Sequence, residues 1–325
     1  LLLRLTSEEY IRNEEITSAI VKRYNGKISE SVEKILLDKL GTEKELFIEE
    51  TNNNYNFVGN VRKPFYVINW LAKKCVPAAD GQVGKTAGYM FYETSEGFHF
   101  KSIDGLFAQD HIRSYVFSDT PDVLKRTDQY DGEIVRINTD NRFIANEKYR
   151  MGVYSTKLIA FDPFNCKYAV FNRNAFDDED GITTSGKNLP TLNPKFNTKS
   201  TRTTYILKDT GSLPSGDLTQ QIRKSSEENF QAEIILNQAI SRYNQFSTGV
   251  VEIDIAPDFD LHAGDAIFID VPDTGGGSTD KLISGKYVIA ILKHAIRAGK
   301  GVTKLGLVRD SFGRKGKPHS GSMVN

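Results

Sequence analysis

Four short apolar segments between residues 249 and 309 constrain the fold more than any other feature of this chain. In the first, Val251, Ile253 and Ile255 alternate with charged residues, which is the pattern of a half-buried strand. Pro257 ends this strand, because proline cannot donate a hydrogen bond to a sheet. Further strands are expected over residues 267–271, 285–293 and 303–309. Four short strands joined by turns predict an antiparallel sheet or barrel.

The segment over residues 285–293 differs from the others, because both of its faces are apolar. Tyr287, Ile289 and Ile291 alternate with Val288 and Ala290. A strand of this kind is covered on both sides. We therefore expect Ile289 to lie in the core of the sheet or barrel.

Two amphipathic helices are expected in the N-terminal part. Residues 29–40 form the first, which Ser29 caps and Gly41 ends. Pro64 opens the second, at the position where its missing N–H costs least, and Pro77 ends it. Shorter strands and hairpins are expected over residues 1–6, 88–101, 115–118, 134–137 and 156–171.

The least structured part of the sequence spans residues 177–201. It holds Asp-Asp-Glu-Asp, two glycines and two prolines, which is typical of a long exposed loop. A long polar helix is expected over residues 217–243, where Asp217 and Gln220 resemble a capping box. Because its apolar stripe is thin, we expect this helix to be exposed or to meet another chain.

The charge balance argues against a dedicated nucleic-acid binder. Lysine and arginine total 42, aspartate and glutamate also total 42, and such binders usually carry a basic excess. Two cysteines cannot form a disulfide framework or a four-thiolate zinc site, which suits synthesis in a reducing cytoplasm. Arg4 ends the first apolar run, and no run reaches the ~20 residues that span a bilayer. We therefore expect no membrane insertion.

The histidines and cysteines offer no recognisable metal or thiol site. No two of the five histidines have the i, i+4 spacing of a helical zinc site. His99 is expected to point outward from a hairpin strand, and His294 to be a satisfied residue at a barrel end. Cys75 is expected to be buried and inert, whereas Cys166 lies in a turn beside Lys167.

The remaining candidate sites are interpreted as loops or local structure. Residues 177–180 lack the alternating ligands of an EF-hand, and residues 275–277 lack the G-x-x-x-x-G-K-[ST] phosphate loop. Arg309 and Asp310 are expected to fix local structure or an interface, and residues 313–325 to form a flexible basic terminus. We assign no catalytic, cofactor-binding or metal-binding residue, and we expect no enzyme.

Three motifs in the C-terminal part carry a family resemblance: GVVEIDIAPDFDLHAGDAIFIDVP, SGKYVIAILKHAI and TKLGLVRDSFG. In this order and spacing, the run resembles the distal barrel of central baseplate hub proteins from contractile-tailed bacteriophages, which are related to the hub part of VgrG spikes in type VI secretion. The N-terminal motifs RLTSEEYIRN, KPFYVINWLAKKC and GYMFYETSEGFHFKSIDGLF are similar to the same family.

The resemblance implies an α+β chain, mainly antiparallel β, with two tail-tube-like β-barrel domains and an inserted α/β subdomain. Residues 1–60 would form part of the first barrel, with the start of the protein missing because the chain lacks an initiating methionine. The remaining divisions would be an inserted subdomain over residues 61–150, a connecting hairpin and long loop over residues 151–216, and a helix plus the second barrel over residues 217–325.

The resemblance also implies a structural role in the virion. Such hubs are homotrimers that adapt a sixfold tail tube to a threefold central spike. They line the channel through which DNA passes without specific binding. The implied partners are the central spike protein, the tail tube or tube-initiator protein and baseplate wedge proteins. The chain would be made in the host cytoplasm and then reside in the baseplate of the phage tail.

Two other function classes stay open at this point. One is a hydrolase that degrades cell-wall glycan with a scattered pair of carboxylates, although nothing in the sequence singles out two of them. The other is a carbohydrate-binding β module of a phage tail. A lytic monomer would indicate the first class, and glycan binding without ring formation would indicate the second.

Overall fold

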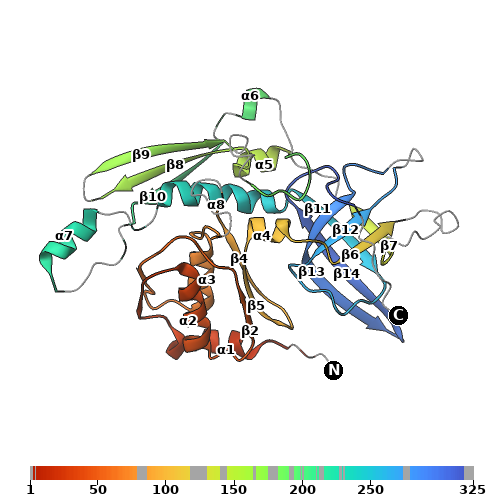
Figure 1. Ribbon diagram of the computed structural model, residues 1–325, viewed down its shortest axis with the longest axis horizontal. Coiled ribbons are helices and arrows are strands. Elements are labelled where there is room, and N and C mark those ends of the chain that lie inside the picture. The colour runs from red at the N-terminus through yellow and green to blue at the C-terminus, as the bar shows by residue number, and fades with distance from the viewer. Residues whose placement is uncertain are drawn as a thin grey trace. The chain divides into compact units, whose positions relative to one another are not determined.

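The computed structural model describes residues 3, 5–78, 86–117, 130–139, 145–163, 166–174, 182–189, 194–197, 199, 201–209, 211, 216–226, 229, 231–273 and 279–317. The chain forms two compact units, which we describe separately (Figure 1). The first unit comprises residues 1–102, 155–181 and 200–242, and the second comprises residues 103–154, 182–199 and 243–325. No helix among the described residues is long and apolar enough to cross a membrane.

A closed barrel of six strands dominates the second unit (Figure 1). The four strands expected between residues 249 and 309 are confirmed. They are β11 (Gly249–Ile255), β12 (Ala266–Asp270), β13 (Gly285–Arg297) and β14 (Lys300–Arg309). The other two are β6 (Arg113–Phe117) and β7 (Gly132–Thr139), and the order around the barrel is β11-β14-β13-β12-β6-β7.

The two added strands make the barrel mixed rather than purely antiparallel. β6 pairs in parallel with both β12 and β7, whereas β7 pairs antiparallel with β11 and closes the ring. Both strands come from residues 61–150, which were expected to form a separate subdomain. Their other barrel partners, β12 and β11, lie more than a hundred residues away along the chain, so no local pattern reveals these two pairings.

The barrel interior is a packed apolar core. Residues on alternate positions of the strands point inward, as the period of two requires. Ile289 is 1% exposed, as expected, but Ile291 is 55% exposed. The register of β13 shifts between these two residues, so Ile291 lies on the outer face. The expectation that this strand is covered on both sides as far as Lys293 is therefore wrong beyond Ile289, because Ala290 and Ile291 are exposed.

The remaining described elements of the second unit are the short helices α4 (Ile103–Ala108), α5 (Ala145–Met151) and α6 (Pro194–Asn197). Residues 182–189, which were expected to be part of an exposed loop, are instead bonded to the C-terminal segment. Ser185 is fully buried, and its backbone N–H donates to the Asp310 carboxylate at 3.0 Å. The acidic run of residues 177–180, the glycines of residues 275–277 and the tail beyond Lys317 lie outside the described residues.

The N-terminal part of the first unit is a small α/β subdomain. Its elements are α1 (Glu8–Glu14), η1 (Ile16–Ser18), β1 (Arg23–Tyr24), α2 (Ile28–Leu40), β2 (Glu45–Ile48), β3 (Phe57–Val58), α3 (Pro64–Ala72), β4 (Tyr89–Glu93) and β5 (Gly97–Ser102). They form a sheet in the order β2-β5-β4 and a separate β1-β3 pair. The described residues of 1–60 therefore contain no barrel. The strand expected over residues 1–6 is absent at the described residues 3, 5 and 6, and Leu3 and Leu5 lie in irregular, exposed chain.

The two expected N-terminal helices are confirmed, with a correction at one end of each. The second helix, α3, ends at Ala72 and not at Pro77, as was expected. Gly41 adopts a left-handed conformation (φ 56°) after α2, and its N–H donates to the Leu37 carbonyl, which is the expected C-terminal stop. Ser29 does not cap α2, because the helix already begins at Ile28. The Ser29 hydroxyl instead accepts a hydrogen bond from the backbone N–H of Thr51.

A second sheet of the first unit contains β8 (Ser155–Asp162), β9 (Lys167–Asn174) and β10 (Arg202–Leu207), in the order β10-β8-β9.

The helix expected over residues 217–243 is divided into α7 (Leu218–Ser226) and α8 (Ala232–Phe246). Asp217 does cap α7, since its carboxylate accepts the N–H of Thr219 at 2.9 Å. A side-chain hydrogen bond joins β8 to α8: the Thr156 hydroxyl donates to the side-chain oxygen of Asn237.

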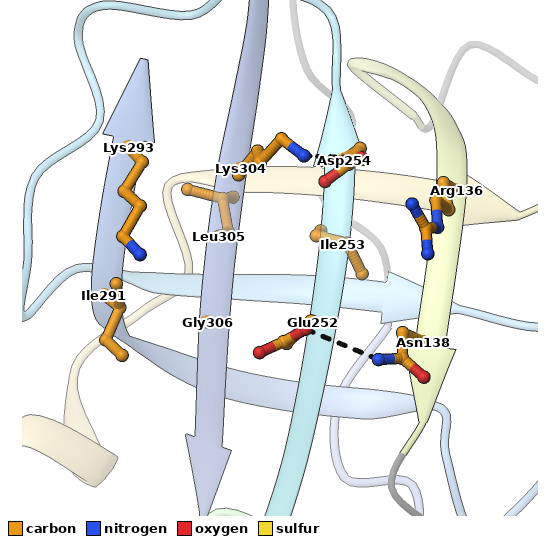
Figure 2. A pocket seen from close by; sticks show the side chains of 10 residues that line it. All are labelled: Arg136, Asn138, Glu252, Ile253, Asp254, Ile291, Lys293, Lys304, Leu305 and Gly306. Atoms are coloured by element: carbon orange, nitrogen blue, oxygen red, sulfur yellow. Dashed lines mark hydrogen bonds and ion pairs between the residues drawn. The ribbon is translucent and has the colours of Figure 1, made fainter. Parts of the chain in front are cut away.

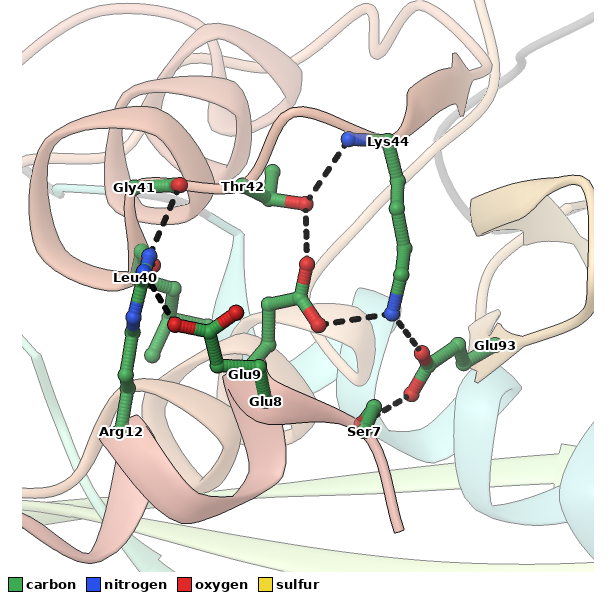
Figure 3. A network of polar contacts seen from close by, with 9 residues as sticks. All are labelled: Ser7, Glu8, Glu9, Arg12, Leu40, Gly41, Thr42, Lys44 and Glu93. Atoms are coloured by element: carbon green, nitrogen blue, oxygen red, sulfur yellow. Dashed lines mark hydrogen bonds and ion pairs between the residues drawn. The ribbon is translucent and has the colours of Figure 1, made fainter.

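A polar network ties α1 to the sheet β2-β5-β4 (Figure 3). The buried Glu9 carboxylate accepts from the Thr42 hydroxyl at 2.7 Å and pairs with Lys44 at 2.6 Å. The Lys44 ammonium also pairs with Glu93 at 2.6 Å. Arg12 donates to the Gly41 carbonyl at 2.9 Å, at the end of α2. Burial opposes the charge on Glu9, but the bonds from Lys44 and Thr42 outweigh it and lower the pKa of this carboxyl.

The Glu9→Gln variant tests this network. We expect its free energy of unfolding at pH 7 to fall by about 1–3 kcal/mol, because charge-assisted hydrogen bonds are lost. Since the folded state lowers the pKa of Glu9, the contribution is present above about pH 4.5 and is lost as the pH falls. Urea unfolding across this range measures it, with exposed Glu33→Gln as the control. Parallel pH profiles of wild type and Glu9→Gln would contradict the role of the network.

Paired substitutions on β13 test the barrel core. Ile289→Asp buries a carboxylate in apolar surroundings, so we expect a loss of several kcal/mol or failure to fold. Ile291→Asp, two residues away on the exposed face, should change the free energy of unfolding by less than about 1 kcal/mol. Chemical denaturation of both proteins gives the comparison. Equal effects at the two positions would show that the register shift in β13 is misplaced.

Candidate interaction site on the outer face of the barrel

A shallow groove of about 190 Å³ crosses the outer face of the barrel over β13, β14, β11 and β7 (Figure 2). Cross-strand pairing arranges its side chains in two rows. One row runs Lys293, Lys304, Asp254 and Arg136, and the other runs Ile291, Gly306, Glu252 and Asn138. Gly306 has no side chain, and a Cβ there would lie 3.1 Å from the Cβ of Ile291. The glycine therefore creates the hollow in the second row.

The groove carries both signs of charge. Lys304 pairs with Asp254 at 3.6 Å, and Asn138 donates to the Glu252 carboxylate at 3.4 Å. Three cationic and two anionic side chains line the groove, so its net charge is one positive unit. Such a surface can bind a polar protein surface in a defined register. A partner bound in another register would place like charges opposite one another, which is unfavourable.

The two carboxylates of the groove lie in open, polar surroundings. Glu252 is exposed, and Asp254 is paired with Lys304. A glycosidase needs one carboxylic acid in a secluded apolar setting that keeps it protonated. The open, ion-paired arrangement on this face therefore favours binding over catalysis.

A second surface feature is the apolar face of the sheet β10-β8-β9. Two cross-strand rows make it up: Tyr205, Ile159 and Val170, and Leu207, Phe161 and Tyr168. The exposed fractions are 75% for Tyr205, 68% for Leu207 and 73% for Tyr168. Contiguous exposed apolar side chains are rare on monomers and mark sites of protein association. Both outer strands of this sheet, β9 and β10, are also open edges within it.

Lys74 has the most strongly shifted pKa among the described lysines. It is 6% exposed, and its ammonium lies 4.5 Å from the ring centre of Trp70 and 4.8 Å from that of Tyr55. The Asp209 carboxylate is 3.9 Å away and accepts a hydrogen bond from the Tyr55 hydroxyl. Burial lowers the pKa of Lys74 to about 8, against the opposing effect of Asp209. Because a substrate cannot reach so buried an amine, we interpret Lys74 as structural.

Two histidines that the sequence singles out, His99 and His294, differ in how they match their expected positions. His99 was expected to point outward, but it is 5% exposed and stacks between Phe47 and Tyr92, with ring centres 4.6 and 4.8 Å away. His294 is satisfied, as expected, through Nδ1, which lies 2.9 Å from the Thr303 hydroxyl.

The two cysteines are both free thiols, and they differ in burial. Cys75 is buried, which raises the pKa of its thiol well above the ordinary value, and Cys166 is exposed. Among the described residues, no three histidine, cysteine or acidic side chains are grouped as metal ligands. Neither thiol therefore lies in a metal-binding cluster of the described structure.

Comparison with known proteins gives structural matches only. No protein-family model matches the chain, and neither does any curated protein sequence. Among solved structures, it is similar to a tail protein from Neisseria meningitidis MC58, with 12% identity, a TM-score of 0.47 and coverage of 91% of this chain and 71% of that one. The 43 kDa tail protein of prophage MuSo2 from Shewanella oneidensis gives 7% identity with the same TM-score and coverage. At these values we rest no functional conclusion on the matches alone.

The Lys74→Met variant tests the interpretation of the buried amine. In the wild type, the lowered pKa means that the unfolded chain holds more protons between about pH 8 and 10.5. The free energy of unfolding therefore rises by up to roughly 3 kcal/mol across that window. Lys74→Met should lack this rise and should be at least as stable as the wild type at pH 7. A strongly destabilised variant would show that the aromatic and Asp209 contacts outweigh the cost of burial.

Proposed function

We propose that this chain is a structural component of a phage tail, and more specifically a subunit of the baseplate hub. The observation that supports a structural role most directly is the exposed apolar face of the sheet β10-β8-β9, where Tyr168, Tyr205 and Leu207 are each more than two thirds exposed. Monomeric proteins rarely leave such a surface exposed, so we infer that a partner covers it. The hub assignment comes from the motifs of residues 249–309, whose strands form the barrel.

The packed interior of the barrel limits the path that DNA could take through an assembly of this chain. Six strands enclose a core of tightly buried apolar side chains, so the barrel interior is filled and is not a pore. In this proposal, the channel lies between copies of the chain. This agrees with a homotrimer whose subunits surround a central opening, as the hub resemblance implies.

The partners proposed for this ring are a central spike protein on one side and the tail tube or its initiator on the other, with baseplate wedge proteins at its periphery. The groove of the barrel, with its mixed charges, suits a polar protein surface. The chain has no net charge, which favours passage of DNA without tight binding to phosphates. In this proposal the protein is made in the host cytoplasm and then resides in the virion.

The mass of the purified protein in solution tests the assembly. We expect light scattering to report three chains. Tyr205→Glu should weaken association more than tenfold, because it places a charge in the covered apolar face. Tyr10→Glu, at a residue of α1 that is 53% exposed, is the matched control and should leave the trimer intact. A stable wild-type monomer that lyses peptidoglycan in a zymogram would contradict the proposal and favour a hydrolase.

A further inference from the structure

One cavity at the end of the barrel contains an unusual charge. It measures about 430 Å³, and the ends of β7, β11 and β14 line it together with Asp280, Leu282 and Ile283. Its surface is mostly apolar, and it includes Arg309 and Phe312. Arg309 follows Leu305 and Leu307 in the inward-facing row of β14, and it is 1% exposed. A guanidinium therefore occupies the last inward-facing position of this strand, whereas the two inward-facing residues before it are apolar.

Two aromatic rings hold this guanidinium in place. Its central carbon lies 4.6 Å from the ring centre of Tyr287 and 5.1 Å from that of Phe312. One terminal nitrogen, Nη1, donates to the Ser284 carbonyl at 3.3 Å. Cation–π contacts of this kind fix the plane of the side chain and leave its edges to make hydrogen bonds.

The guanidinium lacks an anionic partner among the residues that the structure describes. Its Nε is buried and has no hydrogen-bond partner, and no carboxylate of the described residues forms an ion pair with it. The Asp280 carboxylate is held by its own turn, since it accepts from the backbone N–H of Leu282 at 2.7 Å. Burial lowers the pKa of Arg309, and Tyr287, Asp280 and Asp310 only oppose this effect. An unpaired buried charge is costly, so its retention at this position points to a ligand.

Two glycines keep the sides of Arg309 clear. A Cβ at Gly249 would lie 3.2 Å from Nε, and one at Gly285 would lie 3.2 Å from Nη1. Side chains at these positions would crowd the guanidinium in its present conformation. The backbone around the cavity is therefore compatible with a group that approaches the guanidinium closely.

We propose that this cavity binds the carboxylate of an acidic residue from a partner protein, flanked by apolar residues of the same segment. A guanidinium binds carboxylates through parallel hydrogen bonds, and a cavity of this size falls in the range of about 300–1,000 Å³ seen for ligand sites. The rim explains why the carboxylate comes from a protein. Leu282 and Val250 line the cavity and are 67% and 42% exposed, so an apolar segment of a partner would cover them. This inference does not depend on the proposed tail role.

Nuclear magnetic resonance of the full chain tests the site through the Nε–H signal of Arg309, which is assigned by its loss in Arg309→Met. The probe is the capped tripeptide acetyl-Leu-Glu-Leu-amide, and its matched control is acetyl-Leu-Gln-Leu-amide. We expect the glutamate peptide to shift the signal in a saturable way and to bind at least tenfold more tightly than the glutamine peptide. 4-Methylpentanoate serves as the free small carboxylate and should bind more weakly than the glutamate peptide.

Variants of the rim keep the test independent of any effect of Arg309 on folding. Leu282→Ser should weaken binding of the glutamate peptide several-fold. Ile296→Ser, at a residue of β13 that is 71% exposed and does not line the cavity, should not change it. An unmoved Arg309 signal, or equal binding of the two peptides, would overturn the proposal. Equal or tighter binding of 4-methylpentanoate would assign the site to a small metabolite-like carboxylate and would also overturn the partner-chain proposal.

Discussion

The second unit depends on the closure of its barrel by β6 and β7. Without them, β11 and β12 would be the open edges of a four-stranded sheet, each with a row of unpaired backbone groups. The parallel pairing of β6 with β12 and the antiparallel pairing of β7 with β11 remove both edges at once. Closure also fixes which residues face inward, because a slip of one residue would turn every side chain to the other face.

The inward and outward faces then acquire different roles. The inner face is a packed apolar core that ends in Arg309, and the outer face carries the two rows of the charged groove. Gly306 hollows the outer face and Gly249 leaves Arg309 uncrowded. In both places a missing side chain on a strand creates the space in which a partner is proposed to bind.

The local patterns of the sequence predict much of this architecture. The short apolar segments between residues 249 and 309 are enough to predict all four C-terminal strands, and Gly41 and Pro64 are enough for one end of each N-terminal helix. The positions of β6 and β7 in the barrel are not predictable in this way, since their pairings with β12 and β11 join residues far apart in the sequence.

The burial and contacts of single residues are harder to predict than the positions of the strands. His99 is buried through stacking with Phe47 and Tyr92, and the exposure of Ile291 follows from a register shift within β13. Arg309 was expected to fix local structure or an interface. In the structure, Arg309 is the last residue of the inward-facing row of β14. Its guanidinium is therefore buried and lines a cavity, which the sequence pattern does not reveal.

We propose that copies of this chain surround a common opening, since a packed barrel cannot itself be the channel. Cryo-electron microscopy of the purified particle is the most direct test. We expect a closed ring with threefold symmetry, in which the opening lies between subunits. Particles that each contain a single chain, or an open passage through the interior of one barrel, would contradict it.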